Sequence, residues 1–237
     1  MASANQVQLV KNFVANDITF DPVRKNALGG NVVYMKYNGV PRIHLQTPTV
    51  SAPFGLSTYT DEKTGAVKYS LDISFRGMNE DPKIKDFHDK MNDIDEMLIK
   101  EGVSHSKEWF GKKMSTEVIQ EFYRPLVKPS KDPEKYAPTM KFKIMTARDG
   151  SVAVDAYDYQ KKKVDIMESI VPGTKIQALL EANSVWFVGK NMYGISWRLV
   201  QMKIQKSDKI SGFSFLEESD ADEEDEECED EYEEDDL

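Results

Sequence analysis

Along this chain the spacing of apolar residues changes from two to about 3.6 and back again, and the helical part falls in a single block. From Val67 to Arg76, apolar and polar side chains alternate, which is typical of a strand with one buried face. After Pro82, apolar residues from Ile84 to Leu98 follow helical spacing. Short alternating segments return from Thr139. Because helices do not alternate with strands, the pattern disfavours a doubly wound parallel sheet.

The strand and helix signals together predict a mainly β fold of the α+β class. Asn38-Gly39 is a strong signal for a tight hairpin, and Gly102 and Gly111 are expected to end or break helices. We predict helices at about 82–123 and strands at 31–37, 41–47, 67–76, 139–145, 152–157, 175–181, 185–188 and 195–204. This order fits an antiparallel barrel like the oligonucleotide-binding (OB) fold, with the helices inserted after the third strand.

Charge divides the chain into two unequal parts. Residues 217–237 carry 16 acidic side chains and no Lys or Arg, which leaves 31 basic and 25 acidic side chains in residues 1–216, a net charge of +6. Blocks of like charge repel and stay unfolded, so we expect a folded domain at 1–206, a linker at 207–216 and a disordered acidic tail at 217–237. A tethered polyanion can compete with nucleic acid for a basic surface. The alternative is a tail that only keeps the protein soluble.

Signals of catalysis, metal binding and secretion are missing from the sequence. The histidines His44, His88 and His105 lack metal-ligand spacing, and phosphate-loop, nucleophile-elbow and paired-cysteine motifs are absent. The single cysteine, Cys228, lies in the acidic tail, so no internal disulfide can form. We see no signal peptide and no apolar run long enough to span a membrane. We therefore predict an intracellular, non-enzymatic protein without a cofactor or metal.

Basic and aromatic residues recur together in the predicted strands and loops. Single-stranded nucleic acid is bound by cations that contact phosphates and by rings that stack on bases. Period 2 places Tyr34 and Lys36 on one face of their strand, and Lys141 and Lys143 opposite the core of theirs. The predicted DNA-binding residues are Tyr34, Lys36, Arg42, Lys141, Lys143, Lys161, Lys162, Lys163, Trp186, Lys190, Tyr193, Trp197 and Arg198.

Each of these residues also has an ordinary structural interpretation. Strand aromatics are more often core than stacking platforms, and Trp186 and Trp197 lie in apolar company, so we expect at least one of them in the core. We assign Tyr69 and Phe75 to the core. The run 161–163 is equally consistent with a solvated loop.

Three segments resemble a known family. The strand block AVKYSLDISFRG (66–77), the closing block PGTKIQALLEANSVWFVGKNMYGISWRLVQMKI (172–204) and the acidic tail ending in Leu237 resemble single-stranded DNA-binding proteins of the short-tailed coliphage type. They are most similar to the version found in large nucleo-cytoplasmic DNA viruses of eukaryotes. The resemblance covers most of residues 1–216 and is one of pattern and order.

The resemblance implies an OB barrel that coats single-stranded DNA in replication, recombination and repair. It also implies a tail that occupies the DNA groove, in the same or a neighbouring subunit of a homodimer, and that recruits polymerase or helicase-primase. In a virus this would place the protein in the host nucleus or at the viral replication site. The phage proteins end in an aromatic residue, whereas this chain ends in Leu237 and has Tyr232 as the only ring of its tail. The implied partner-binding residues are Glu223, Glu224, Asp225, Glu226, Glu227, Tyr232 and Leu237.

Two other functions fit the same sequence. An acidic tail also suits a chaperone of histones or other basic proteins, although such a chaperone has no use for a basic, aromatic-rich face. RNA binding stays open because nothing in the sequence reads the 2′-hydroxyl group.

Overall fold

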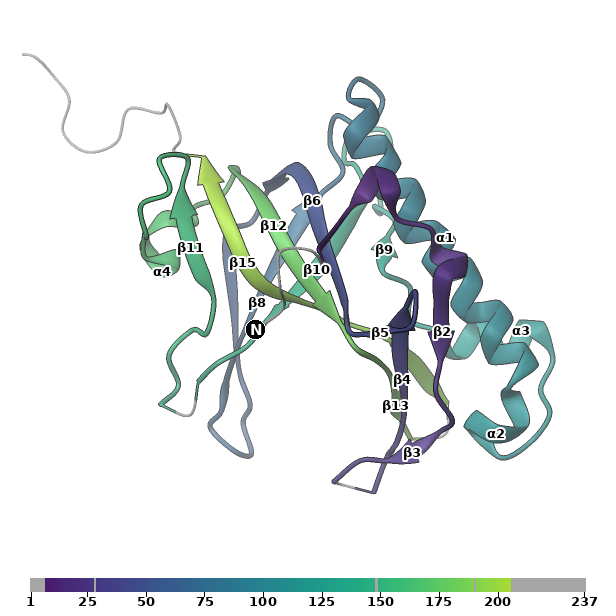
Figure 1. The fold of residues 1–237 in the computed structure, drawn as a ribbon. Coiled ribbons are helices and arrows are strands. Elements are labelled where there is room, and N and C mark those ends of the chain that lie inside the picture. Colours follow the sequence, from purple (N-terminus) through teal and green to yellow (C-terminus); the bar gives the residue numbers. More distant parts are fainter. Residues whose placement is uncertain (1–6, 28, 148, 190, 206–237) are drawn as a thin grey trace, which may run out of the picture. The chain divides into compact units, whose positions relative to one another are not determined.

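Five strands close into a barrel, which Figure 1 shows beside the block of helices at 82–122. The computed structural model describes residues 7–205 except 28, 148 and 190. Ser51 pairs with Ser74, and this contact between the first and last strands closes the ring. In ring order the strands are β6 (Ile43–Ala52), β12 (Thr174–Ala182), β15 (Trp197–Gln205), β10 (Thr139–Ile144) and β8 (Val67–Ser74).

Four shorter strands extend the barrel in the described part of the chain: β1 (Val7–Leu9), β7 (Leu56–Thr60), β9 (Val127–Lys128) and β11 (Asp155–Asp158). Most pairs are antiparallel, but β15 lies parallel to both β10 and β11, and β1 lies parallel to β6. The prediction of a mainly β, OB-like barrel is confirmed, with these parallel pairs as an addition. The predicted linker 207–216 and acidic tail 217–237 lie outside the described residues.

A second, open sheet packs beside the barrel. Figure 1 shows β12 leading directly into β13, so one extended ribbon belongs to both sheets. Likewise β14 leads into β15 with only Ser196 between them. The strands of this sheet are β2 (Ile18–Phe20), β3 (Arg24–Lys25), β4 (Asn31–Tyr37), β5 (Val40–Pro41), β13 (Ser184–Val188) and β14 (Met192–Ile195).

The predicted hairpin at Asn38-Gly39 forms, but its second strand is shorter than expected. Pairing with β4 ends at Pro41. Arg42 then adopts a left-handed backbone with a φ of 66°, which turns the chain away from β4. From Ile43 onward the chain pairs with β12 instead. The prediction of one partner strand at 41–47 is therefore wrong, because the turn at Arg42 sends these residues into the barrel.

The first three helices form the predicted block and cover one side of the strands, whereas a fourth, short helix that was not predicted lies beside β11 (Figure 1). Asp81 accepts a hydrogen bond from the amide of Lys83 at the start of α1, and Gly111, with a φ of 84°, ends α2. The apolar face of α1 is fully buried and packs against β6, β9 and two short 3-10 helices. The helices are α1 (Pro82–Ser104), α2 (Ser106–Phe110), α3 (Thr116–Phe122) and α4 (Ile166–Ser169), with 3-10 turns at Val10–Asn12 and Ala15–Asp17.

Candidate nucleic-acid interface

A cleft of about 640 Å³ lies over β8 and β10, bordered by β7 and by the segment 124–128. Positively charged side chains come from three separate elements of the fold, and no carboxylate is among the described residues that line the cleft. These cations are Lys68, Arg124, Lys128, Lys141 and Lys143.

A second cleft of about 460 Å³ continues the first. The two share Lys143, Met145, Trp186 and Ser196, and the second extends to Asn183, Ser184 and Arg198. We call the two together the cationic groove. It runs from the edge of the barrel at β7 to the junction between the barrel and the open sheet.

Strand register explains why these side chains share one face. Residues directly opposite each other in neighbouring strands point to the same side of the sheet. Lys143 lies opposite Ser70 on one side and Arg198 on the other. The pairing continues without a break through the row Ser57, Ser70, Lys143, Arg198, Glu181 and His44, which spans β7, β8, β10, β15, β12 and β6.

The lysines of the groove are only weakly engaged by protein carboxylates. Lys141 lies 3.1 Å from Asp72 and Lys68 lies 3.4 Å from Asp61. Both lysine side chains are substantially exposed, at 45% and 60%. Ion pairs of this kind contribute about 0–1 kcal/mol, and Lys143 forms none with the described residues. The lysines are therefore available to an incoming phosphate.

Three rings accompany these cations. Tyr59 is 60% exposed, and the ammonium of Lys68 lies 5.9 Å from its ring centre. Tyr69 and Trp186 are half-buried and line the groove. A Cβ atom on Gly194 would lie 2.9 Å from the indole of Trp186, so only glycine leaves room for this ring position. The assignment of Tyr69 to the core is confirmed in part, because the ring packs against the core and also lines the groove.

A buried carboxylate of the helical insertion fixes one wall of the groove, the segment 124–128. Asp95 of α1 accepts hydrogen bonds from the Tyr123 hydroxyl at 2.6 Å and the Leu126 amide at 3.0 Å. The Val127 amide lies 3.4 Å from its second oxygen. Burial raises the pKa of Asp95, and these hydrogen bonds oppose the rise. The carboxylate thereby fixes the segment that carries Arg124 and Lys128.

The structure brings several of the predicted site residues together. The residues that line the groove are Lys141, Lys143, Trp186 and Arg198. Arg42 lies at the edge of the groove, since it contacts Glu181, which also contacts Arg198. Tyr34 is 40% exposed and lies opposite Ser184 in the register, so it extends the same face into the open sheet. Lys36 shares that face and pairs with Asp21 at 2.6 Å.

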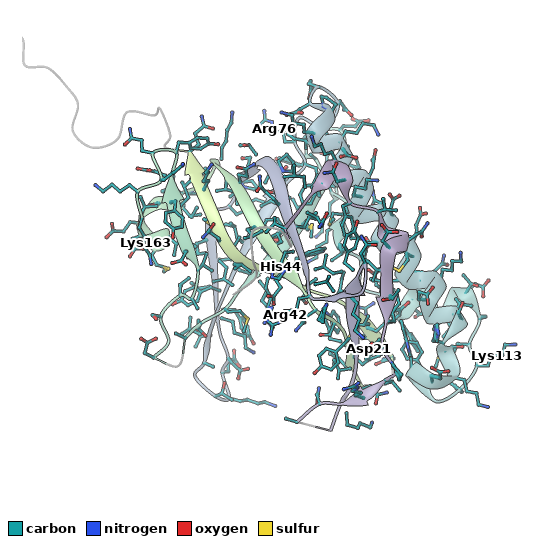
Figure 2. The ribbon with its side chains drawn as sticks, viewed as in Figure 1. Asp21, Arg42, His44, Arg76, Lys113 and Lys163 are labelled. Carbon is teal, nitrogen blue, oxygen red and sulfur yellow. The ribbon has the colours of Figure 1, made fainter. Side chains whose placement is uncertain are left out.

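Other predicted residues lie elsewhere. The run 161–163 follows β11, and Figure 2 shows Lys163 well away from Arg42 and His44. Lys161 lines a separate cleft of about 320 Å³ with Tyr157 and Lys203. Lys163 lies 2.8 Å from Asp155. Lys190 and the seven tail residues from Glu223 to Leu237 lie outside the described residues.

Two predicted stacking rings are in the core instead, and we remove them from the interface. Trp197 and Tyr193 are both 0% exposed, so no base can reach either ring. Trp197 faces the barrel interior, while its neighbour Arg198 faces out. The Tyr193 ring packs on Phe110, Tyr123 and Phe187, and its hydroxyl donates to the Leu98 carbonyl at 3.2 Å.

The sequence interpretation missed Tyr59, Lys68, Arg124 and Lys128. Lys68 had a usable signal, since it occupies the polar phase of the strand at 67–76. Arg124 and Lys128 belong to a proline-rich connector whose position depends on the long-range contact with Asp95. In the described residues no cluster of metal-ligating side chains is present. Over the same residues, no helix has the length and apolar character needed to cross a bilayer.

Comparisons with solved structures find similar proteins at low sequence identity. The single-stranded DNA-binding protein of bacteriophage Enc34, solved in complex with single-stranded DNA, is 18% identical, with a TM-score of 0.44 over 82% of this chain and 99% of that one. The protein gp2.5 of bacteriophage T7, a single-stranded DNA-binding protein, is 13% identical, with a TM-score of 0.49 over 73% of this chain and 97% of that one.

Sequence comparisons give one further match. No curated protein sequence matches the chain. A family profile matches residues 72–217, which include the end of β8, the helical block and the strands from β9 to β15. The chain therefore belongs to DUF5871, a family of unknown function.

Proposed function

We propose that the cationic groove binds single-stranded DNA with little sequence preference and without a catalytic step. The observation that carries this proposal is the composition of the groove, which is lined by cations and by three partly exposed rings, with no lining carboxylate among the described residues. Cations neutralise phosphates and release counterions. Rings stack on bases of any identity, which contributes about 1–3 kcal/mol per base.

The position of the rings favours single strands over duplexes. Trp186 and Tyr69 are half-buried and line the groove, so a base must leave its own stack to contact them. The bases of a duplex are already stacked on one another, whereas the bases of a single strand are free to stack on these rings. RNA would use the same contacts, and a direct comparison of the two polymers will separate them. The alternative of a chaperone is disfavoured, because a surface of this charge would repel the histones or other basic proteins that a chaperone has to bind.

We further propose that the protein acts in replication, recombination and repair in a large DNA virus, as the sequence resemblance implies. In this proposal the acidic tail 217–237 competes with DNA for the groove of its own or a neighbouring subunit. Once displaced, the tail recruits polymerase or helicase-primase. A flexible tether keeps the tail at an effective concentration on the order of millimolar. DNA therefore binds only where its affinity for the groove is high enough to displace the tethered tail.

The groove is tested by fluorescence anisotropy with labelled oligo(dT), matched oligo(rU) and duplex over a range of salt concentrations. The double variant Lys141→Ala/Lys143→Ala should weaken oligo(dT) binding roughly 10-fold or more, and the log–log salt slope should fall by about 1.4 for two lost phosphate contacts. The matched control is Lys112→Ala/Lys113→Ala, which removes two exposed lysines beyond α2 that do not line the groove, and Figure 2 shows Lys113 well away from Arg42. Equal losses in the two double variants would contradict the proposed groove.

The tail is tested by deleting residues 217–237 and measuring oligo(dT) binding at fixed salt. Removing the competitor should tighten binding and abolish stimulation of a partner polymerase. Equal or weaker binding by the shortened protein would refute competition while leaving the groove itself in place.

A further inference from the structure

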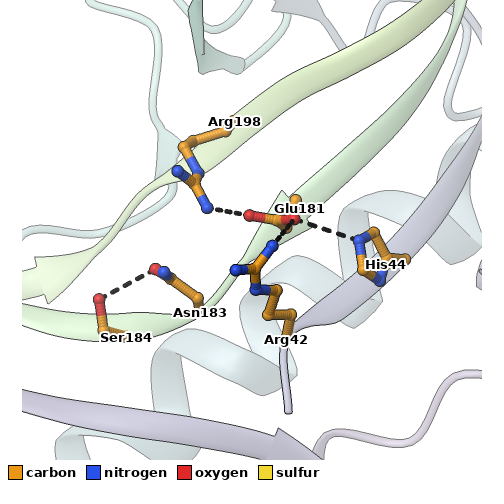
Figure 3. Close-up of polar contacts among 6 residues, drawn as sticks. All are labelled: Arg42, His44, Glu181, Asn183, Ser184 and Arg198. Carbon is orange, nitrogen blue, oxygen red and sulfur yellow. Dashed lines mark hydrogen bonds and ion pairs between the residues drawn. The ribbon is translucent and has the colours of Figure 1, made fainter. Parts of the chain in front are cut away.

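A cluster of charged residues lies where the barrel meets the open sheet (Figure 3). Both oxygens of the Glu181 carboxylate are engaged. Arg198 donates to Oε1, whereas Oε2 lies 3.6 Å from the Arg42 guanidinium and 3.2 Å from Nε2 of His44. The Glu181 side chain is only 10% exposed, and that of Arg42 is 63% exposed. An internal carboxylate therefore occupies the space between two guanidinium groups.

The cluster opens directly into the cationic groove. Arg198 lines the groove together with Asn183 and Ser184. The Ser184 hydroxyl and the Asn183 side chain lie 3.0 Å apart beside the cluster, as Figure 3 shows. Lys143 is the register partner of Arg198 on the neighbouring strand. A ligand in the groove would thus meet two arginines, a lysine and two neutral polar side chains at this end.

We propose that this cluster is a site for one backbone phosphate of the bound strand, and that Glu181 occupies the site in the free protein. The inference rests on the proposed function and makes it more specific. On binding, the phosphate takes over the exposed guanidinium of Arg42 and shares that of Arg198, while Glu181 keeps its contact with His44. An anion must therefore bind the two guanidinium groups more strongly than Glu181 does, and weakly bound anions are excluded from the site.

Charge and geometry support this exchange. Guanidinium groups bind carboxylate and phosphate oxygens with the same forked geometry. Burial and the neighbouring charges of Arg42 and Arg198 lower the pKa of His44, which favours neutral imidazole. The two arginines and one carboxylate then leave one uncompensated positive charge. The contact from Arg42 to Glu181 is long and solvent-exposed, so it is the one that a phosphate replaces at the lowest cost.

The test is Glu181→Gln, measured as oligo(dT) affinity by fluorescence anisotropy at about 0.1 M salt. Removing the internal competitor should tighten binding roughly 3- to 10-fold and steepen the log–log salt slope, by up to about 0.7 for one additional phosphate contact. The matched control is Asp89→Asn, which removes one carboxylate of an exposed ion pair with Lys85 on α1, a helix that does not line the groove. The control should leave both quantities within twofold of the unaltered protein.

A second variant keeps the proposal testable if Glu181→Gln folds poorly. Arg42→Ala removes an exposed side chain, so it should fold normally, bind oligo(dT) less tightly and lose about 0.7 from the salt slope. In the Arg42→Ala background, Glu181→Gln should tighten binding much less than it does alone. Salt slopes unchanged by both single variants, in a protein that still binds oligo(dT), would overturn the phosphate site and leave the groove standing. Failure of the unaltered protein to bind oligo(dT) would instead refute the proposed function.

Discussion

Two poorly exposed carboxylates, Asp95 and Glu181, hold different parts of the molecule in different ways. Asp95 belongs to α1 of the helical insertion, and its hydrogen-bond donors among the described residues are neutral, a tyrosine hydroxyl and backbone amides. Glu181 lies on the outer face of the barrel and is held by two arginines and a histidine. Both sit beside the groove, since Asp95 fixes its wall and Glu181 closes one of its ends.

The difference lies in what each carboxylate could exchange. Neutral donors fixed in the backbone cannot move to another anion without unfolding the segment 124–127. Arginine side chains, and the exposed Arg42 above all, can turn towards a phosphate. A carboxylate with neutral partners therefore marks architecture, whereas one with cationic partners on an open face marks a place where an external anion can compete.

The largest expected effect comes from removing the architectural carboxylate. Asp95→Asn places an amide NH₂ group opposite the amides of Leu126 and Val127 and leaves buried donors unpaired. We expect a loss of about 2–4 kcal/mol in the free energy of unfolding. Chemical denaturation measures it, with Asp89→Asn as the exposed control on the same helix. A loss below about 1 kcal/mol would mean that Asp95 does not fix the groove wall.

The next largest effect concerns the ring at the junction of the two clefts. Trp186→Ala should weaken oligo(dT) binding roughly 10-fold, because a stacked base contributes about 1–3 kcal/mol, while the salt slope should stay unchanged. Phe54→Ala is the control, since that ring is 65% exposed and does not line the groove. If the two variants bind equally well, Trp186 contacts no base.

A smaller effect is expected in the pH dependence of stability, to which His44 beside Glu181 and Asp95 contribute in opposite directions. The pKa of His44 is lowered in the folded state, so below about pH 6.5 the unfolded chain takes up a proton that the folded protein does not. Its contribution to stability is therefore present above that pH and is lost as the pH falls, by at most about 1.4 kcal/mol per pH unit. The raised pKa of Asp95 acts in the opposite direction, with a contribution that is lost as the pH rises through the raised value.

Denaturation of the unaltered protein and His44→Gln at several pH values between 5 and 8 measures this contribution. The variant should lose stability less steeply than the unaltered protein below about pH 6.5. Parallel curves would show that His44 titrates alike in the folded and unfolded states.

The smallest expected effect is at the basic loop beyond β11. Lys161→Ala/Lys162→Ala removes two exposed lysines that do not line the cationic groove. We expect oligo(dT) affinity to change by less than about twofold at 0.15 M salt, because charges beyond a Debye length of about 8 Å are largely screened. A loss as large as that of Lys141→Ala/Lys143→Ala would extend the DNA path to this loop.

Local patterns were enough to predict much of the fold. Alternation identified β8 and β10, and apolar spacing with Pro82, Gly102 and Gly111 located the helical block within a few residues. The two-residue strands and the departure of the chain at Arg42 were not predictable, since they depend on pairings with residues far away in the sequence.

The candidate site was predicted only in part for the same reason. Alternation placed Lys141 and Lys143 on the outer face of β10, but it could not tell Trp197 from Trp186. Trp197 is buried in the barrel, whereas Trp186 lies at the junction between the two sheets. This difference depends on which strands pair, since β13 pairs with β14 in the open sheet and β15 pairs with β12 in the barrel. Glu181 drew no attention in the sequence because its partners come from two other segments, with Arg42 and His44 in one and Arg198 in the other.

The continuous ribbon of β12 and β13 joins the two contacts on which the proposals depend. Glu181 and Trp186 are five residues apart on extended chain, which corresponds to roughly 16 Å, and the Asn183 carbonyl between them accepts a hydrogen bond of 2.9 Å from the Met35 amide. The interval between the Glu181 cluster and the Trp186 ring is therefore set by covalent geometry. In the proposed complex, a phosphate held by Arg42 and a base stacked on Trp186 would be kept at a fixed spacing, whatever the sequence of the bound strand.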